Sequence, residues 1–232
     1  MQVRYSIRLG LVTAVALSYV TAAVAQEKSV NPGINDSFQA PNVSSFVERF
    51  EKEGREVYDR REAIVAACEV KPGMLVADVG AGTGLFTRLF AEQVGPEGRV
   101  YAVDIARNFV DHVRDSSRAA GLNNVIGVVA SGDSTNLPPN SVDVVFICDT
   151  YHHFEFPHKT MSSIHRALRP GGTVVLIDFE RVEGESSDWI LGHVRAGQEV
   201  FEKEVAEAGF EKIDERDLLK DNYFTRFKKV MP

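Results

Sequence analysis

The sequence is poor in cysteine and lacks the usual spacings of metal-binding residues. Its 232 residues include two cysteines, and it contains no Cys-x-x-Cys pair or cysteine–histidine cluster. Cys68 ends a helical pattern and Cys148 lies in an apolar run typical of a strand, so we expect two buried thiols rather than a disulfide. Asp149, Asp178 and Glu180 could be drawn as a metal site, but nothing in the sequence fixes their geometry. The sequence therefore predicts no metal site.

Positive charge is also scarce. Lysine and arginine number 26 against 33 aspartates and glutamates, which gives a formal net charge of −7. Proteins that hold nucleic acid through phosphate contacts need the opposite balance, so we expect no nucleic-acid partner. With 44% hydrophobic residues, the chain is long enough to form one ordinary domain with a full core.

Three signatures of nucleotide-binding enzymes are missing. The sequence has no Gly-x-x-x-x-Gly-Lys-[Ser/Thr] phosphate loop and no Tyr-x-x-x-Lys pair. The dinucleotide fingerprint requires its second and third glycines to lie three residues apart, but here Gly82 is followed by Gly84, and Leu85 stands at the required position. Classes that depend on these motifs are therefore disfavoured.

The stretch 74–87 is what the sequence offers instead. An apolar run leads into Asp78, the glycines Gly80, Gly82 and Gly84 follow, and a helical pattern begins at Leu85. This order predicts a buried strand, a tight loop that a ligand can approach closely, and a helix N-terminus. The loop contains no basic residue and Asp78 precedes it, so it suits a ligand with a cationic or amino end better than a pyrophosphate.

The N-terminal 25 residues have the pattern of a secretory signal peptide. Arg4 and Arg8 precede an apolar stretch, and Ala23-Val24-Ala25 forms a small-x-small cleavage site. The apolar stretch is too short for a comfortable membrane span. We expect a periplasmic or secreted protein with no stable membrane insertion after cleavage. An uncleaved anchor or a start-site artefact is the alternative.

The remaining chain divides into a linker and one domain. Residues 26–43 are rich in Asn, Pro, Gly and Ser and predict a flexible linker, and residues 44–232 predict the functional domain. Strands alternate with helices, which predicts an α/β sheet covered on both faces. We expect strands at 74–79, 99–104, 125–129, 142–148, 173–178, 210–215 and 223–229, and helices that include 56–67, 158–168 and 189–208.

Asp104 stands at the end of the second predicted strand. In a doubly wound sheet this position lies beside the glycine loop, where a carboxylate can accept hydrogen bonds from both ribose hydroxyls. The alternative is a helix N-cap, for which aspartate is also well suited. Its spacing from Gly84 favours ribose binding.

Four motifs together resemble class I S-adenosylmethionine-dependent methyltransferases. They are residues 76–84 with the glycine loop, Asp104, the loop Ser131-Gly-Asp133, and Leu168-Arg-Pro-Gly-Gly172 before a strand. The resemblance implies S-adenosylmethionine as cofactor. It also implies a single-domain, Rossmann-like, doubly wound sheet of seven strands in the order 3-2-1-4-5-7-6, with the last strand antiparallel. The cofactor-binding residues that it implies are Asp78, Gly80, Ala81, Gly82, Gly84, Asp104, Ile105, Gly132, Asp133, Ser134 and Asp149.

Candidates for a catalytic base lie at the end of the fourth predicted strand. Tyr151, His152 and His153 follow it, and ligands of open α/β sheets bind at the carboxyl ends of strands. A base is needed only if the acceptor is protonated at the working pH, and a purely structural role for the histidines is the alternative.

Substrate contacts are predicted from two further places. His193 and Arg195 lie between two glycines in a helical pattern, and Tyr58 lies in a helical region that could cover the cofactor. The aromatic residues Phe154, Phe156 and Trp189 could line an apolar pocket.

We expect in-line methyl transfer to a small molecule. A protein methyltransferase of the isoaspartyl type and a non-catalytic protein that binds an adenosyl ligand are the alternatives. The sequence predicts no oligomeric state.

Overall fold

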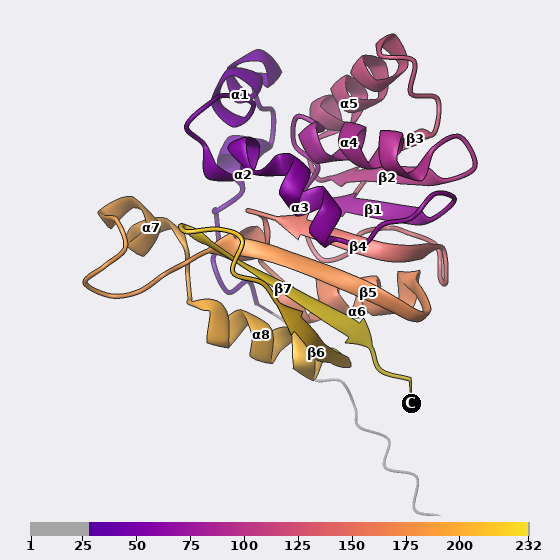
Figure 1. Ribbon diagram of the computed structural model, residues 1–232. Helices are drawn as coiled ribbons and strands as arrows, with labels where there is room; N and C mark the ends of the chain where they lie inside the picture. The colour runs from indigo at the N-terminus through magenta and orange to yellow at the C-terminus, as the bar shows by residue number, and fades with distance from the viewer. Residues whose placement is uncertain (1–27, 232) are drawn as a thin grey trace, which may run out of the picture.

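The computed structural model describes residues 28–231, so the predicted signal peptide at 1–25 lies outside the described residues. A seven-stranded sheet forms the centre of the molecule (Figure 1), with the strand order β3-β2-β1-β4-β5-β7-β6. The strands β1 to β5 pair in parallel and β7 pairs antiparallel with both neighbours. The predicted fold class and strand order are therefore confirmed. The strands are β1 (Leu75–Val79), β2 (Arg99–Asp104), β3 (Val125–Val129), β4 (Val142–Cys148), β5 (Leu168–Phe179), β6 (Phe210–Glu215) and β7 (Asn222–Lys229).

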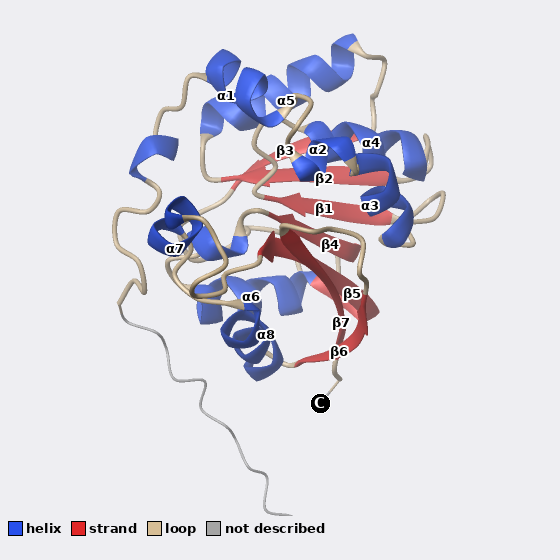
Figure 2. Ribbon diagram, turned by 60° about the vertical axis from the view of Figure 1, so that its left-hand side comes forward, coloured by secondary structure: helices blue, strands red, loops and turns tan. Residues whose placement is uncertain are grey.

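Helices cover both faces of this sheet (Figure 2). On one face, α3 and α4 bury Ile64 and Phe90 against Phe146 of β4; on the other, α6 and α8 bury Met161 and Phe201. Burial of such side chains contributes about 1.5–3 kcal/mol each. The longer helices are α1 (Val43–Phe50), α3 (Arg61–Ala67), α4 (Leu85–Val94), α5 (Arg107–Ala119), α6 (Pro157–Ala167) and α8 (Gln198–Glu207). The shorter ones are η1 (Asp36–Phe38), α2 (Glu56–Asp59), η2 (Tyr151–His153) and α7 (Asp188–His193).

Three predicted elements differ from the observed ones. The helix predicted over 56–67 is divided into α2 and α3, and the helix predicted over 189–208 is divided into α7 and α8 by the extended residues Val194 and Gly197. The strand predicted to begin at Thr173 begins at Leu168, with a register shift against β4. Helical periodicity does not show these interruptions, because each is set by contacts with distant parts of the chain.

The predicted linker makes specific contacts with the domain. The backbone N–H of Val30 donates to Glu155 O at 2.9 Å, and the Asn35 side chain donates to His153 O at 3.0 Å. The Phe38 ring lies with its centroid 5.0 Å from that of His153. Residues 28–43 therefore cover the carboxyl ends of the strands, a position that their composition does not indicate.

Two smaller expectations concern cysteines and membrane spans. Cys68 is buried, Cys148 is half-buried, and both are free thiols, as predicted. Among residues 28–231 no helix has the length and apolar character needed to cross a membrane.

Candidate functional site

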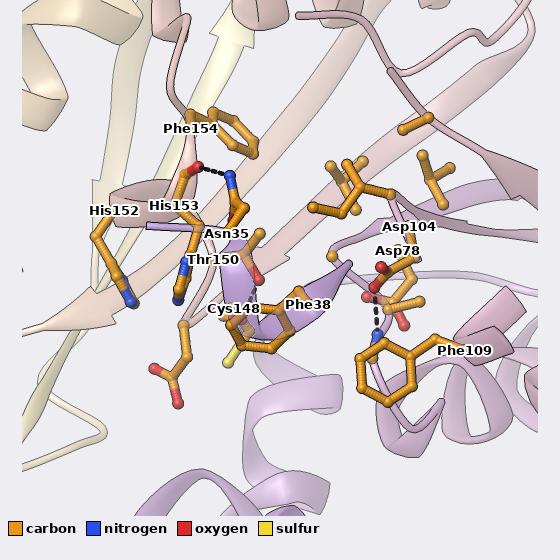
Figure 3. A pocket seen from close by; sticks show the side chains of 18 of the residues that line it. Asn35, Phe38, Asp78, Asp104, Phe109, Cys148, Thr150, His152, His153 and Phe154 are labelled. Carbon is orange, nitrogen blue, oxygen red and sulfur yellow. Dashed lines mark hydrogen bonds between the residues drawn. The ribbon is translucent and has the colours of Figure 1, made fainter. Parts of the chain in front are cut away.

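A cavity of about 600 Å³ opens at the carboxyl ends of β1, β2 and β4. Figure 3 shows two groups of side chains facing each other across it. Asp78, Asp104 and Phe109 lie on one side, and His152 and His153 lie on the other. The topology explains this position, because parallel strands end at one edge of the sheet and leave a crevice there.

Glycines shape the loop after β1 by allowing close packing. Gly80 has φ +77°, and a Cβ at this position would collide with the Thr150 side chain. Gly84 has φ +82°, and a Cβ there would lie 2.7 Å from Val113 of α5. Side chains rarely adopt such backbone angles, so both positions require glycine. Gly80 therefore joins the loop to the end of β4, whereas Gly84 serves helix packing.

Asp104 holds the glycine loop in place. One carboxylate oxygen accepts from the backbone N–H of Gly82 and the other from that of Ala106, each at 2.9 Å. Burial raises the pKa of Asp104, and these two donors oppose the rise. Each oxygen retains a second lone pair, so the carboxylate can also accept from a ligand hydroxyl. The hydrogen bonds from Gly82 and Ala106 are therefore compatible with the predicted binding of ribose by Asp104.

Asp78 is a buried acid that makes no hydrogen bond with a cationic side chain within residues 28–231. Its side chain accepts a hydrogen bond of 2.6 Å from the Thr87 hydroxyl. Burial raises its pKa to about 7, and the nearby Asp104 carboxylate adds to the rise. A cationic group in the cavity would favour the ionised form. The predicted place for the amino end of the cofactor is therefore electrostatically suited to it.

Most of the predicted cofactor residues line the cavity, and two do not. Gly84 lies outside the lining because it packs on α5. Asp133 lies at the tip of a turn that Ser131 and Ser134 bridge, and it pairs with Lys159 at 3.5 Å instead. The predicted cofactor residues that do line the cavity are Asp78, Gly80, Ala81, Gly82, Asp104, Ile105, Gly132, Ser134 and Asp149.

Asp149 ties the N-terminal region to the end of β4. Its carboxylate accepts from Arg55 at 2.6 Å and from the Asn222 side chain at 2.7 Å. Its φ of +48° is unusual for a residue other than glycine and costs on the order of 1–3 kcal/mol. Burial raises the pKa of Asp149 and the Arg55 guanidinium opposes this. Such strain is held in place by surrounding contacts and is concentrated at functional sites.

His152 and Asp178 form a buried pair beside the cavity. Asp178 accepts from the His152 backbone N–H at 3.1 Å, and its other oxygen lies 2.8 Å from Nδ1 of the imidazole. Both side chains are almost fully buried. Burial disfavours the imidazolium, but the Asp178 carboxylate outweighs this and raises the pKa of His152.

Two further histidines meet His152. Their ring centroids lie 4.3 Å from His152 to His153, 5.1 Å from His152 to His193, and 5.2 Å from His153 to His193. Burial lowers the pKa of His153 to about 3, and the charge of His152 contributes. The pKa of His193 is lowered by the same two causes, and Asp178 opposes the shift. His153 and His193 are therefore neutral at physiological pH and are weak bases.

Three other predicted functional residues lie outside the cavity lining. The Tyr151 hydroxyl donates to Glu204 at 3.1 Å in the core, and burial raises its pKa well above the usual value. Arg195 pairs with the same Glu204 at 2.6 Å, and Tyr58 contacts Arg61 by a cation–π interaction. Tyr151 and Arg195 thus support the packing of α8, because a buried tyrosine hydroxyl and a buried guanidinium need polar partners.

Sequence reasoning expected the region before the sheet to cover the cofactor through Tyr58, but it missed the residues of that region that line the cavity. Asn35, Phe38, Arg49, Phe50 and Arg55 all line the cavity. The only signal for them was the spacing of aromatic residues in a helical pattern, which also fits an ordinary core. Of the predicted aromatic lining, Phe154 and Trp189 are present and Phe156 is not.

Comparison with a family model indicates the class of enzyme. A family model described as a methyltransferase domain matches residues 77–176, which include the glycine loop, Asp104 and most of β5. Together with the fold, this match supports a class I S-adenosylmethionine-dependent methyltransferase domain, with S-adenosylmethionine as the cofactor.

Individual methyltransferases are similar to about half of this chain. The chain is 32% identical over 114 residues to the ubiquinone/menaquinone biosynthesis C-methyltransferase UbiE of Hydrogenovibrio crunogenus, covering 49% of this chain and 45% of that protein. It is also 32% identical over 120 residues to UbiE of Ralstonia pickettii, covering 51% and 48%. The chain therefore spans about half the length of these relatives.

Solved structures share the fold over a larger part of the chain. A SAM-dependent methyltransferase from Aquifex aeolicus superposes with a TM-score of 0.73 at 24% identity, over 82% of this chain and all of that one. Phosphoethanolamine N-methyltransferase 2 of Haemonchus contortus, in complex with S-adenosyl-L-methionine, gives a TM-score of 0.69 at 18% identity, over 87% and 61%.

Proposed function

We propose that this chain transfers the methyl group of S-adenosylmethionine, by in-line displacement, to a small acceptor with a largely apolar body. The observation that carries the proposal is the continuity of one cavity between the glycine loop with Asp104 and a wall of histidine and aromatic rings. The cofactor supplies a methyl group activated by its sulfonium. The protein then needs to position the acceptor and to exclude water.

The residues on the glycine-loop side are proposed to bind and orient the cofactor. Asp104 would accept hydrogen bonds from the ribose hydroxyls while still holding Gly82 and Ala106. Asp78 would face the amino end, whose positive charge favours its ionised form. Nine of the eleven predicted cofactor residues line the cavity and support this assignment.

The opposite side is proposed to receive the acceptor. Phe38, Phe154, Phe179 and Trp189 line the cavity near the histidines, and Trp189 stacks on His193 with centroids 4.7 Å apart. Such a wall favours a planar apolar ring over a strongly hydrated amine or a peptide. The names of the curated relatives, C-methyltransferases of quinone biosynthesis, agree with an acceptor of this chemistry.

A methyl-transfer assay tests the proposal. Tritiated S-adenosylmethionine is offered with phenols and quinols, with aliphatic amines, and with an isoaspartyl peptide; an Asp104→Ala variant serves as the control. We expect label on an aromatic hydroxyl compound, and much less label with the variant when the cofactor concentration does not saturate it. Label confined to the peptide would favour the protein methyltransferase. Cofactor binding without transfer to any acceptor would favour the adenosyl-binding alternative.

Export is part of the proposal and depends on the pattern of residues 1–25 alone. It raises a question of supply, because S-adenosylmethionine is made in the cytosol. N-terminal sequencing of the protein from cell fractions tests it. A chain that begins at Gln26 outside the cytosol would support export, and a cytosolic chain that begins at Met1 would contradict it.

A further inference from the structure

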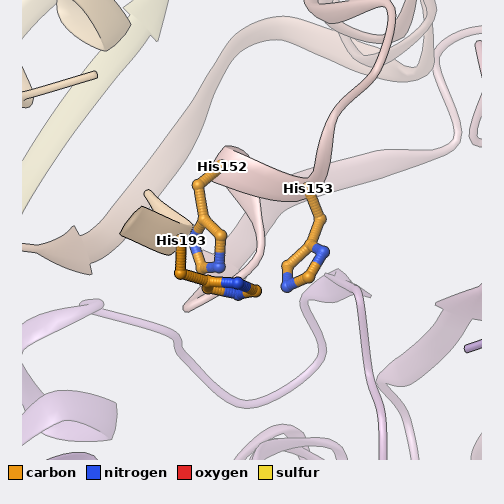
Figure 4. A group of neighbouring side chains, drawn as sticks. All are labelled: His152, His153 and His193. Atoms are coloured by element: carbon orange, nitrogen blue, oxygen red, sulfur yellow. The ribbon is translucent and has the colours of Figure 1, made fainter. Parts of the chain in front are cut away.

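We propose that His152, His153 and His193 hold one divalent transition-metal ion of the zinc class at the acceptor side of the cavity. One potential ligand nitrogen from each histidine lies within 4.8 Å of the others. Figure 4 shows the three rings gathered around one space, His152 and His153 from η2 and His193 from α7. In the described residues this is the group of histidine, cysteine and acidic side chains that meets the geometry of a metal site.

The three ligand nitrogens need to move only slightly closer together to bind a metal ion. In a tetrahedral zinc site with Zn–N bonds of about 2 Å, the ligand nitrogens lie about 3.3 Å apart. The rings would therefore close by on the order of 1 Å, through side-chain rotation. His193 lies at the end of α7, with Trp189 rather than a buried core against it. It is the ligand most able to make this movement.

The Asp178 carboxylate holds the His152 ring in the way that is usual for a metal-ligating histidine. A metal-ligating histidine typically donates its other ring N–H to a carboxylate, which fixes the tautomer and the ring orientation. Asp178 lies 2.8 Å from Nδ1 of His152, and it also accepts from the His152 and Phe179 backbone N–H groups. With Nδ1 engaged in this way, Nε2 of His152 is left with a lone pair for a metal ion.

The other two rings are held by no competing polar contact. His153 Nδ1 is buried and has no hydrogen-bond partner in the described part of the chain. The contacts of the His193 ring within residues 28–231 are aromatic, with Trp189, His152 and His153. A buried imidazole nitrogen without a hydrogen-bond partner, as in His153, is unusual for a purely structural cluster. Imidazole ligands favour zinc, copper, iron and nickel over magnesium or calcium.

Three protein ligands leave a coordination position for a substrate, and all three histidines line the cavity. Here the inference builds on the proposed function. An acceptor hydroxyl bound to the metal would lose its proton to solvent and become an oxyanion. Its oxygen, or a conjugated ring carbon, would form the new bond to the methyl carbon as the S–CH₃ bond breaks with its electron pair on sulfur. After attack by a ring carbon, the hydrogen on that carbon would leave to solvent as a proton and the ring would regain its aromaticity. No histidine would then need to act as the base.

Cobalt binding tests the site without the methyl-transfer assay. The tag-free protein, stripped of metal, is titrated with Co²⁺, and the visible spectrum is recorded. We expect one equivalent to give the absorption bands of tetrahedral cobalt and Zn²⁺ to abolish them. His193→Ala should weaken Co²⁺ binding about 100-fold, and Asp178→Asn about 10- to 100-fold. His112→Ala, on α5 outside the cavity lining, is the matched control and should bind like wild type.

Two results would overturn the metal site. One is the absence of tetrahedral cobalt bands in folded wild-type protein, and the other is equal affinity in the wild type and the His193→Ala variant. Circular dichroism checks that Asp178→Asn is folded, and His193→Ala keeps the test decisive if it is not. S-adenosylhomocysteine binding, measured in the same samples, separates the two proposals. Its loss with cobalt binding intact would count against the methyltransferase function alone.

Discussion

The two sides of the cavity are built in different ways. The cofactor side consists of Asp78, the glycines Gly80 and Gly82, and Asp104, which come from two neighbouring strands and the loop between β1 and α4. The acceptor side consists of Phe38, His152, His153, Trp189 and His193, which come from η1, η2 and α7. One side is local in the sequence, and the other is assembled from distant segments.

The two sides also differ in how firmly they are held. On the cofactor side, backbone N–H groups and the Thr87 hydroxyl hold both acids. On the acceptor side, Trp189 is 57% exposed and His193 has aromatic contacts but no hydrogen bond within the described residues. Under the proposed function, a firmly held cofactor side and the loosely held Trp189 and His193 would let the acceptor vary while the cofactor contacts stay the same.

Gly80→Ala is expected to have the largest effect, because Gly80 lies where the two sides meet. A Cβ there would collide with Thr150, and the φ of +77° would strain any side chain. We expect S-adenosylhomocysteine affinity to fall more than about 100-fold and the free energy of unfolding to fall by about 2–4 kcal/mol. Calorimetric titration and urea denaturation measure these changes.

Gly192→Ala is the matched control for this change. An added Cβ there meets no atom within 4 Å, and the residue lies on α7 of the acceptor side. We expect cofactor affinity close to that of the wild type. If the two substitutions lowered cofactor affinity equally, the two sides of the cavity would not differ in their contribution to cofactor binding.

Asp104→Ala should weaken the cofactor side alone. The variant loses the acceptor for the Gly82 and Ala106 N–H groups and the proposed ribose contacts. Hydrogen bonds to a charged group contribute about 1.5–3 kcal/mol, which predicts a loss of about 10- to 100-fold in S-adenosylhomocysteine affinity. Cobalt binding by the histidines should stay unchanged. A parallel loss of both ligands would mean that the two sides do not act separately.

Arg55→Ala tests the junction of the N-terminal region with β4. Arg55 is about three-quarters buried and pairs with the strained Asp149, whose carboxylate would lose its cationic partner. We expect the free energy of unfolding to fall by about 1–3 kcal/mol, less than for a fully buried pair. Arg114→Ala removes an exposed pair on α5 and should have no measurable effect. Urea denaturation of both variants measures the two changes in unfolding free energy.

A gradual effect is expected from pH. The pKa of Asp78 is about 7 in the fold, against an ordinary value of 3.8, so the unfolded chain loses this proton first. Its contribution to stability is full below about pH 4 and is lost as the pH rises through about 7, with a slope of at most about 1.4 kcal/mol per pH unit.

Two measurements check this dependence. The unfolding free energy of the cofactor-free protein, followed from pH 5 to 8, should fall less steeply in Asp78→Asn than in the wild type. S-adenosylhomocysteine affinity should rise with pH up to about 7 in the wild type, because the ionised carboxylate favours the ligand ammonium. An unchanged slope in the variant would show that Asp78 is not the group responsible.

The same contrast explains how much the sequence could predict. The glycine loop and Asp104 follow from short-range spacing, and the strand order follows from the family resemblance that these motifs carry. The structure has all three where they are predicted. Asp133 lies outside the cavity lining for a local reason, since a motif does not show that its turn points the side chain toward Lys159.

The acceptor side could be predicted only in part, residue by residue, because its assembly depends on tertiary contacts. His193 was selected for its odd glycine context, but nothing in the sequence brings it against His152 and His153. The sequence predicts no metal site because the third histidine of the cluster lies far along the chain. Phe38 was assigned to a linker, although its ring packs on His153. Arg195 was selected with His193 but turns to Glu204.

A crystal structure with S-adenosylhomocysteine tests most directly the claim that one cavity has a cofactor side and an acceptor side. We predict that both ribose hydroxyls lie within hydrogen-bond distance of the Asp104 carboxylate and that the sulfur faces the space in front of the three histidines. A ribose bound away from Asp104, or a sulfur turned away from His153 and His193, would contradict it.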